Sequence, residues 1–211
     1  NSLPKARLTG NPVRDSISRL APPEQRYAQR QDALRILILG GSQGALILNQ
    51  IVPAALARLG VQPPLQIWHQ CGERHLEATL ETYADAGVHA RVAAFIDDMA
   101  EAYAWADLVI CRAGALTIAE LAAAGVAAVL IPFPHAVDDH QTKNAQWLAK
   151  AQAARLLPQA SCSLEVLRET LQGLLASGRA GLLNMAQKAR QLAQPEATHD
   201  VARYCLEVAR V

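Results

Sequence analysis

One stretch, LRILILGGSQGA at positions 34–45, constrains the fold of this chain more than any other. Its apolar first half has the length and side chains of a buried strand, and a helical pattern follows the glycines. Glycines permit a tight turn and a close approach of a bound group to the backbone. The helix beyond the turn presents unpaired N–H groups and the positive end of its dipole. The stretch therefore predicts a strand, a glycine turn and a helix start suited to a phosphate.

The glycine spacing separates this turn from two well-known phosphate-binding motifs. Gly40, Gly41 and Gly44 do not fit G-x-G-x-x-G, and no Lys-Ser or Lys-Thr pair follows them as in a P-loop. Ser42 adds a hydroxyl that can donate to a phosphate oxygen. A glycine-rich connection without a ligand fits the same residues, so the turn by itself leaves both interpretations open.

Apolar runs and helical patterns alternate along the chain from residue 34 onward. Strands are expected at residues 35–39, 65–69, 91–95, 108–111, 127–131 and 154–157. Helices are expected at residues 45–59, 73–86, 98–105, 116–124, 140–150, 163–176, 179–192 and 198–211. Strands that are apolar throughout are covered on both faces. We therefore expect an α/β fold with a doubly wound, six-stranded parallel sheet of the Rossmann-like type, which binds ligands beyond the carboxyl ends of its strands.

Residues 1–33 differ in composition from the rest of the chain. They carry four prolines and many polar residues, and are expected to be a lead-in or linker from an upstream amino-terminal domain rather than part of the core. Residues 34–211 are expected to form the ligand-binding domain with its carboxyl-terminal helices. The chain has no apolar run long enough to span a bilayer and no signal-peptide core at its start.

Charge and composition argue against several classes of site. A net charge of +1 and an aromatic content of 4% argue against a broad nucleic-acid surface. The four cysteines, at 71, 111, 162 and 205, are too widely spaced for a disulfide framework, so free thiols are expected. Cys71 lies between His69 and His75, but no fourth ligand has suitable spacing, so no metal site is expected.

A second glycine turn, CRAGALTIAE at 111–120, follows the fourth expected strand. The helix start beyond it supplies a second set of free N–H groups. Thr117 and Glu120 share a face near this helix start. Two interpretations are open: the two residues form a capping box, or the Glu120 carboxylate accepts both hydroxyls of a ribose.

Two further segments follow strands and carry polar groups. In FIDDM at 95–99, either aspartate can cap a helix, whereas the N–H and C=O of Ile96 match the donor–acceptor edge of uracil. In DDHQTKNA at 138–145, either aspartate can cap the helix and Gln141 can recognise sugar hydroxyls. His140 can be a general base, although a lone histidine in a polar loop more often is not.

Taken together, these motifs resemble the MurG family. The matching segments are GNPVR at 10–14, GGSQGA at 40–45, FIDDM at 95–99, CRAGALTIAEL at 111–121 and DDHQTKNA at 138–145. The resemblance implies one half of a GT-B fold, the donor-binding carboxyl-terminal half. It implies an inverting glycosyltransferase that moves GlcNAc from UDP-GlcNAc to the C4 hydroxyl of MurNAc-pentapeptide-pyrophosphoryl-undecaprenol in peptidoglycan synthesis. The acceptor site and the proposed base belong to the amino-terminal half, so this chain is expected to bind donor without catalysing transfer and to contain no catalytic residue.

The resemblance also implies donor contacts, residue by residue. The principal UDP-GlcNAc-binding residues that it implies are Arg14, Ser42, Ile96, Ala115, Leu116, Thr117, Glu120 and Gln141. Arg14, Ser42 and the second helix start would contact the diphosphate. Ile96 would pair with uracil, Glu120 would hold the ribose and Gln141 would contact the sugar. Weaker candidates are Gly41, Gln43, Gly44, Asn49, Met99, Gly114 and His140, the last standing where family members often carry glutamine.

The expected partners follow from the same resemblance. They are the UDP-GlcNAc donor and, through the other half, an undecaprenyl-linked acceptor, with no cofactor, metal or nucleic acid. The full-length protein is expected at the cytoplasmic face of the bacterial inner membrane as a peripheral protein, and this chain to be soluble. The alternatives are a UDP-sugar epimerase domain, a non-catalytic nucleotide-binding module, and a dehydrogenase-type domain that the glycine spacing disfavours.

Overall fold

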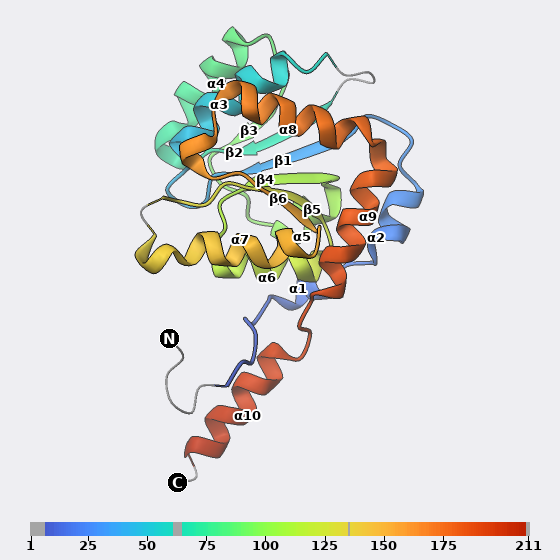
Figure 1. The fold of residues 1–211 in the computed structure, drawn as a ribbon, viewed down its shortest axis with the longest axis vertical. Coiled ribbons are helices and arrows are strands. Elements are labelled where there is room, and N and C mark those ends of the chain that lie inside the picture. The colour runs from blue at the N-terminus through green and yellow to red at the C-terminus, as the bar shows by residue number, and fades with distance from the viewer. Residues whose placement is uncertain (1–6, 61–64, 135, 210–211) are drawn as a thin grey trace.

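A six-stranded parallel sheet forms the centre of the molecule (Figure 1). The structure is a computed structural model that describes residues 7–60, 65–134 and 136–209. The strands are β1 (Arg35–Leu39), β2 (Gln66–Gln70), β3 (Arg91–Ala93), β4 (Leu108–Cys111), β5 (Ala127–Leu130) and β6 (Ala154–Leu156). Their order is β3-β2-β1-β4-β5-β6, with every neighbouring pair parallel. The predicted fold class is confirmed, and β3 ends two residues earlier than expected.

Helices cover both faces of the sheet. Their bounds are α1 (Asp15–Ser18), α2 (Pro23–Ala28), α3 (Leu46–Ala57), α4 (Leu76–Asp85), α5 (Met99–Trp105), α6 (Ala115–Ala124), α7 (His140–Lys150), α8 (Leu164–Ala176), α9 (Gly178–Gln191) and α10 (Ala197–Ala209), with 3₁₀ helices η1 (Glu73–His75), η2 (Val137–Asp139) and η3 (Gln159–Ser161). In Figure 1, α3, α4 and α8 lie on one face, α5, α6 and α7 lie on the other, and α10 projects away from the body. None of the helices described has both the length and the apolar character needed to cross a membrane.

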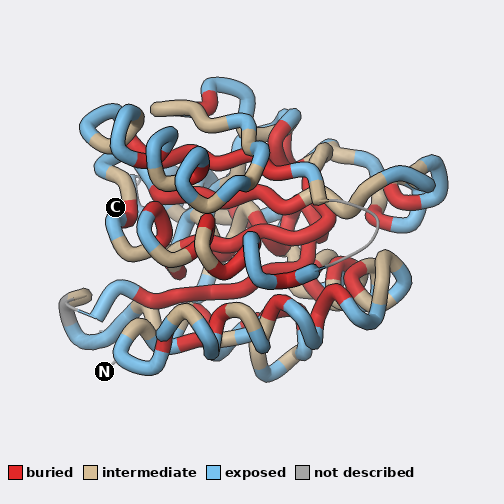
Figure 2. Tube along the Cα trace, turned by 90° about the horizontal axis from the view of Figure 1, so that it is seen from above, coloured by how far each residue is buried: buried red, intermediate tan, exposed pale blue. Residues whose placement is uncertain are grey.

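The core has two layers, one on each face of the sheet. Leu37 and Val109 belong to the cluster beneath α5, α6 and α7, whereas Ile36 and Ile110 belong to the cluster beneath α3 and α8. All four are fully buried because alternate strand residues point to opposite faces and both faces are covered. Figure 2 shows this buried material running through the middle of the molecule, with exposed residues on the outer sides of the helices.

Part of the segment expected to be a lead-in belongs to the core. Ile17 of α1 and Tyr27 of α2 are 0% and 3% exposed. Arg26 donates to the carbonyl oxygens of Ala124 and Gly125 at 2.6 Å, which ties α2 to the end of α6. The expectation that residues 1–33 contribute nothing to the core is therefore wrong, because a few apolar residues among the prolines pack on α5, α6 and α9. Their role as a lead-in from another domain stays a prediction.

Candidate nucleotide-binding site

The order of the strands brings the two glycine turns together. The chain runs outward from β1 through β2 to β3, and then returns to place β4 on the other side of β1. Leu39 and Cys111, the last residues of β1 and β4, are direct partners in the parallel ladder. The turns that follow them therefore lie side by side at the point where the strand order reverses, which is where open α/β sheets bind ligands.

The first turn needs glycine at two positions for different reasons. Gly41 and Gly44 have φ values of +79° and +74°, which side chains with a Cβ adopt only with strain. A Cβ on Gly44 would lie 2.2 Å from the carbonyl oxygen of Cys71, so the turn packs tightly against the end of β2. α3 then begins at Leu46, and no side chain caps its start. Its first N–H groups are thus left for solvent or a ligand.

The second turn also leads into a helix without a side-chain cap, although Gly114 has a φ of −61°. α6 begins at Ala115 after Gly114, and again no side chain caps the start. Thr117 is the third residue of the helix, so the capping-box interpretation, which placed Thr117 at the cap, is wrong. Asn11 donates to the carbonyl oxygen of Ala115 at 3.3 Å, which places the GNPVR segment beside this helix start.

A cavity of about 250 Å³ lies between the two turns. The principal candidates that line it are Arg14, Ser42, Ile96, Thr117 and Glu120, and the weaker candidates that line it are Gly41 and Met99. These residues come from four separate segments of the chain. The first glycine turn, the first turn of α6, an arginine and a hydroxyl thus border one space, which is an arrangement that favours an anion.

Glu120 is held at the edge of this cavity by two partners. Its Oε1 accepts from an Nη of Arg14 at 3.2 Å, and its Oε2 accepts from the Tyr103 hydroxyl at 3.0 Å. Burial, reinforced by the nearby Glu120 charge, raises the pKa of Tyr103 well above its usual value, so Tyr103 stays a donor. Each carboxylate oxygen retains a second lone pair, so Glu120 is oriented and can still accept from a diol.

Ile96 lines the cavity next to the end of β3. Ile96 is 5% exposed, and among the residues described neither its N–H nor its C=O forms a hydrogen bond within the protein. Asp98 accepts from the N–H of Glu101 at 2.9 Å, so the prediction of an aspartate cap on α5 is confirmed for Asp98. The cap holds the segment and leaves the peptide groups of Ile96 available to a donor–acceptor edge such as that of uracil.

Residues 35–201 match the glycosyltransferase family 28 C-terminal domain. The chain belongs to this family. It is 56% identical over 203 residues to the UDP-N-acetylglucosamine--N-acetylmuramyl-(pentapeptide) pyrophosphoryl-undecaprenol N-acetylglucosamine transferase of Marinobacter nauticus, covering 96% of this chain and 56% of that protein. The protein of the same name from Dechloromonas aromatica is 55% identical, over 95% of this chain and 56% of its own length. The chain thus spans about half the length of these relatives.

Solved structures agree with the family assignment. The crystal structure of Acinetobacter baumannii MurG matches with a TM-score of 0.84 and 47% identity, over 90% of this chain and 55% of that one. The C-terminal domain of a glycosyl transferase group 1 protein from Francisella tularensis matches with a TM-score of 0.57 and 17% identity, over 86% and 96% of the two chains. The second match concerns the fold alone, whereas the first confirms the resemblance to MurG that the motifs predict.

Other residues predicted from the family motifs lie outside the cavity lining. Gln141 accepts through Oε1 from the N–H groups of Ala113 and Phe133, at 3.2 and 2.9 Å, and so fastens the loop after β5 to the second turn. Ala115 and Leu116 are exposed at the start of α6, as is His140 at the start of α7. The remaining candidates of this group are Gln43, Gly44 and Gly114, which shape the turns.

Asn49 has a structural role that its position in the sequence does not reveal. It is 3% exposed, donates to the carbonyl oxygen of Cys71 at 3.0 Å and pairs with Nε2 of His69 at 3.0 Å. Asn49 does not line the cavity of the candidate site, and its contact with the sugar stays a prediction. The other ring nitrogen of His69 pairs with the Tyr83 hydroxyl at 2.9 Å, so this histidine has no nitrogen free for a metal. Burial lowers the pKa of His69 to about 3, so the ring is neutral.

Gln70, Tyr103 and Arg112 also line the cavity and were not predicted. Arg112 donates to the carbonyl oxygens of Ile131 and Pro132, at 3.1 and 3.2 Å, and burial lowers its pKa. Arg112 could have been predicted as a site residue from the sequence, because it directly follows the strand β4. Gln70 is the last residue of β2, and a polar side chain at the carboxyl end of a buried parallel strand is a similar signal.

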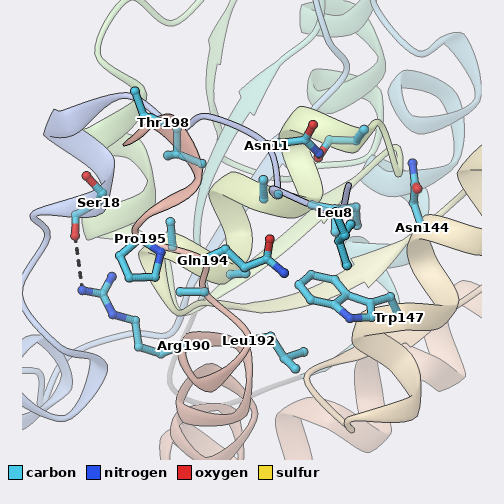
Figure 3. Close-up of a pocket in the computed structure, with 18 of the residues that line it drawn as sticks. Leu8, Asn11, Ser18, Asn144, Trp147, Arg190, Leu192, Gln194, Pro195 and Thr198 are labelled. Carbon is cyan, nitrogen blue, oxygen red and sulfur yellow. Dashed lines mark hydrogen bonds between the residues drawn. The ribbon is translucent and has the colours of Figure 1, made fainter. Parts of the chain in front are cut away.

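A larger cavity, of about 810 Å³, lies on the other side of α6 (Figure 3). Apolar side chains such as Leu8, Trp147 and Leu192 line it, and Arg190 at its margin donates to the carbonyl oxygen of Ser18. Of the predicted site residues, Ala115 alone lines it within the part of the chain described. It is larger than the first cavity, but Arg14, Ser42, Ile96 and Glu120 do not line it.

Proposed function

We propose that this chain is the donor-binding half of an inverting N-acetylglucosaminyltransferase that takes UDP-GlcNAc as its donor. In the longer protein, the GlcNAc is transferred to the C4 hydroxyl of MurNAc-pentapeptide-pyrophosphoryl-undecaprenol, a lipid-linked precursor of peptidoglycan. The relatives from Marinobacter and Dechloromonas carry that activity in their names and support the assignment. The acceptor site and the catalytic base belong to the other half of such a protein.

The observation that carries this proposal is the cavity between the first glycine turn and the first turn of α6, each part of a connection into a helix that has no side-chain cap. A diphosphate seated there accepts from backbone N–H groups of α3 and α6 and from the Ser42 hydroxyl. Arg14 supplies a full positive charge at the same place. The uracil ring pairs with the Ile96 peptide groups, and Glu120 accepts from the ribose hydroxyls.

The same contacts account for a role in the reaction. When the acceptor hydroxyl displaces UDP from C1 of the sugar, negative charge builds up on the departing diphosphate. Fixed N–H dipoles and a guanidinium that already face the phosphates stabilise this charge without reorganising. The chain therefore contributes leaving-group stabilisation and donor orientation, while proton removal from the acceptor takes place in the other half.

The lipid-linked acceptor suggests where the longer protein works. Its undecaprenyl tail stays in a bilayer, so an enzyme that uses it operates at a membrane surface. We therefore place the full-length protein peripherally at the cytoplasmic face of the bacterial inner membrane. Polypeptide outside this chain provides the membrane contact.

Calorimetric titration of this chain with UDP-GlcNAc, UDP and NAD tests the proposal. We expect saturable binding of UDP-GlcNAc and UDP with one site per chain, and no binding of NAD. NAD binding without UDP binding would discard the transferase assignment. A UDP-sugar epimerase is the second candidate because it shares the nucleotide contacts; appearance of an epimerised UDP-sugar after incubation with UDP-GlcNAc would favour it over the transferase.

A further inference from the structure

We infer that Gln70 is the positioning residue that joins the phosphate-binding turn to the base-binding segment, so that the two parts of the nucleotide site act together. The inference rests on the proposed function and concerns a residue to which the family motifs assign no role. Gln70 lies at the end of β2, between β1 and β3, with Leu39 and Ala93 as its direct partners in the ladder. Its side chain therefore lies between the two segments that follow those strands.

The carboxamide of Gln70 uses both of its N–H donors and its oxygen on the backbone of these two segments. Oε1 accepts from the N–H of Gly41 at 2.9 Å, and Nε2 donates to the carbonyl oxygens of Gly41 and Ala94, each at 2.9 Å. The main-chain oxygen of Gln70 also accepts from Gly40 at 2.8 Å. Gln70 is 5% exposed, so these bonds are screened little by water.

The chemistry of the three contacts demands an amide. The turn presents one donor and one acceptor, and the base-binding segment presents a second acceptor. Only a carboxamide supplies one acceptor and two donors from a single planar group. The orientation of the amide is also fixed, because Nε2 must face the two carbonyl groups and Oε1 must face the N–H.

The position of these contacts explains why they matter for binding. Gly41 precedes Ser42, and Ala94 lies two residues before Ile96. The N–H of Gly41 donates to Oε1 of Gln70 and is therefore not available to a ligand. Gly41, one of the weaker predicted candidates, thus does not contact a phosphate through its N–H. The N–H of Gly44 donates to the carbonyl oxygen of Gly41 at 2.9 Å, so the N–H groups that the turn offers to a phosphate are those of Ser42 and Gln43. Gln70 thus sets the spacing between the Ser42 hydroxyl and the Ile96 peptide groups, and UDP must span this spacing because one molecule carries both the uracil and the diphosphate.

A double-mutant cycle between Gln70 and Ser42 tests this inference by calorimetry. Gln70→Met keeps the length of the side chain and removes all three hydrogen bonds, and we expect it to weaken UDP binding about 10-fold. In the otherwise unchanged chain, Ser42→Ala should weaken UDP binding about 5-fold, but in the Gln70→Met background less than about 2-fold, because the hydroxyl is no longer held at the phosphate. Gln66→Met, at the exposed opposite end of β2, is the matched control and should leave UDP affinity unchanged.

The possible outcomes separate this inference from the proposed function. If the unchanged chain does not bind UDP, both the inference and the proposed function are wrong. If it binds UDP but the losses from Ser42→Ala and Gln70→Met multiply, Gln70 does not act through the turn and the inference is overturned while the function stands. Thermal unfolding checks that each variant is folded at the titration temperature. Gln70→Glu, which cannot donate to the two carbonyl groups, is the second variant, and unfolding of both would show that Gln70 is structural only.

Discussion

The polar groups at the two ends of strands β1 and β4 differ in whether they have partners within the protein. At the amino ends, Asp107 is fully buried and pairs with Arg30 and with Arg179, the latter at 3.1 Å. It also accepts from the N–H of Arg35 at 3.0 Å. At the carboxyl ends, the helix starts of α3 and α6 are left without side-chain caps. One end thus satisfies its charges within the protein, whereas the other leaves donors for a ligand.

This difference indicates how one sheet serves both stability and binding. A buried carboxylate that loses its cations, or cations that lose their carboxylate, cost several kcal/mol, so the amino end tolerates little change. Uncapped N–H groups at a solvent-facing cavity cost little because water binds them in the absence of ligand. Residues at the carboxyl end that contact the ligand can therefore be substituted without unfolding the domain.

The largest effect that we predict comes from the amino end. Asp107→Asn leaves the Arg30 side chain, which is 7% exposed, without a counter-charge and leaves Arg179 only its 3.7 Å contact with Asp32, and should lower the free energy of unfolding by about 3–5 kcal/mol. Urea unfolding at pH 7 measures this loss, with the exposed Asp85→Asn as control. A loss of stability below about 1 kcal/mol would mean that the ion pairs of Asp107 contribute little to the stability of the fold.

A fall in pH should lower the free energy of unfolding through His69, which lies near the carboxyl end of β2. Its pKa is lowered to about 3 in the folded chain by burial, whereas an unfolded histidine titrates near its usual value. The stabilising contribution is complete above the unfolded pKa and is lost as the pH falls, because the unfolded state binds the proton first. Between pH 6.5 and 5 the free energy of unfolding should drop by about 2 kcal/mol through this residue.

Chemical unfolding of His69→Gln across this pH range isolates that contribution. The variant should lack the drop, while His89→Gln, which changes an exposed histidine, should keep it. Parallel pH profiles for the unchanged chain and His69→Gln would contradict a neutral buried imidazole.

Glu120 should affect binding rather than stability. Glu120→Gln keeps an acceptor for the Tyr103 hydroxyl but removes the charge that accepts from ribose, and should weaken UDP binding by about 1–3 kcal/mol. Titration of UDP measures the loss, and Glu77→Gln on the exposed side of α4 controls for net charge. Unchanged UDP affinity would remove Glu120 from the site.

The smallest effect concerns the hydroxyl of the first turn. Ser42→Ala should weaken UDP binding by roughly 1 kcal/mol, because one hydrogen bond to phosphate is lost. Uridine has no phosphate, so its affinity should stay the same. Comparison of the two titrations checks the assignment, and equal losses for both ligands would place Ser42 away from the phosphate.

The fold was predictable because its signals are local. Apolar runs separated by helical patterns located every strand of the sheet within two residues at either end. The packing of Ile17 and Tyr27 was missed because prolines dominate the composition of that segment, and burial depends on contacts that are distant in sequence. The free cysteines were predicted from spacing and confirmed, since no disulfide links the described Cys71, Cys111, Cys162 and Cys205.

The site was predictable only in part. Spacing placed Thr117 and Glu120 on one face, but could not show that α6 begins at Ala115, which removes the capping box. Asn49 follows the first turn closely, yet its helix directs it toward Cys71 and His69. The contact between Arg14 and Glu120 joins residues that are 106 positions apart, and the motifs implied only that both touch the donor.

The measurement that tests the central claim most directly is the change in backbone amide chemical shifts when UDP is added. If the two helix starts hold the diphosphate, the amides of residues 42–46 and 114–117 shift together with that of Ile96, and saturate at one UDP per chain. Shifts confined to the larger cavity, around Trp147 and Leu192, with none at either helix start, would contradict the account.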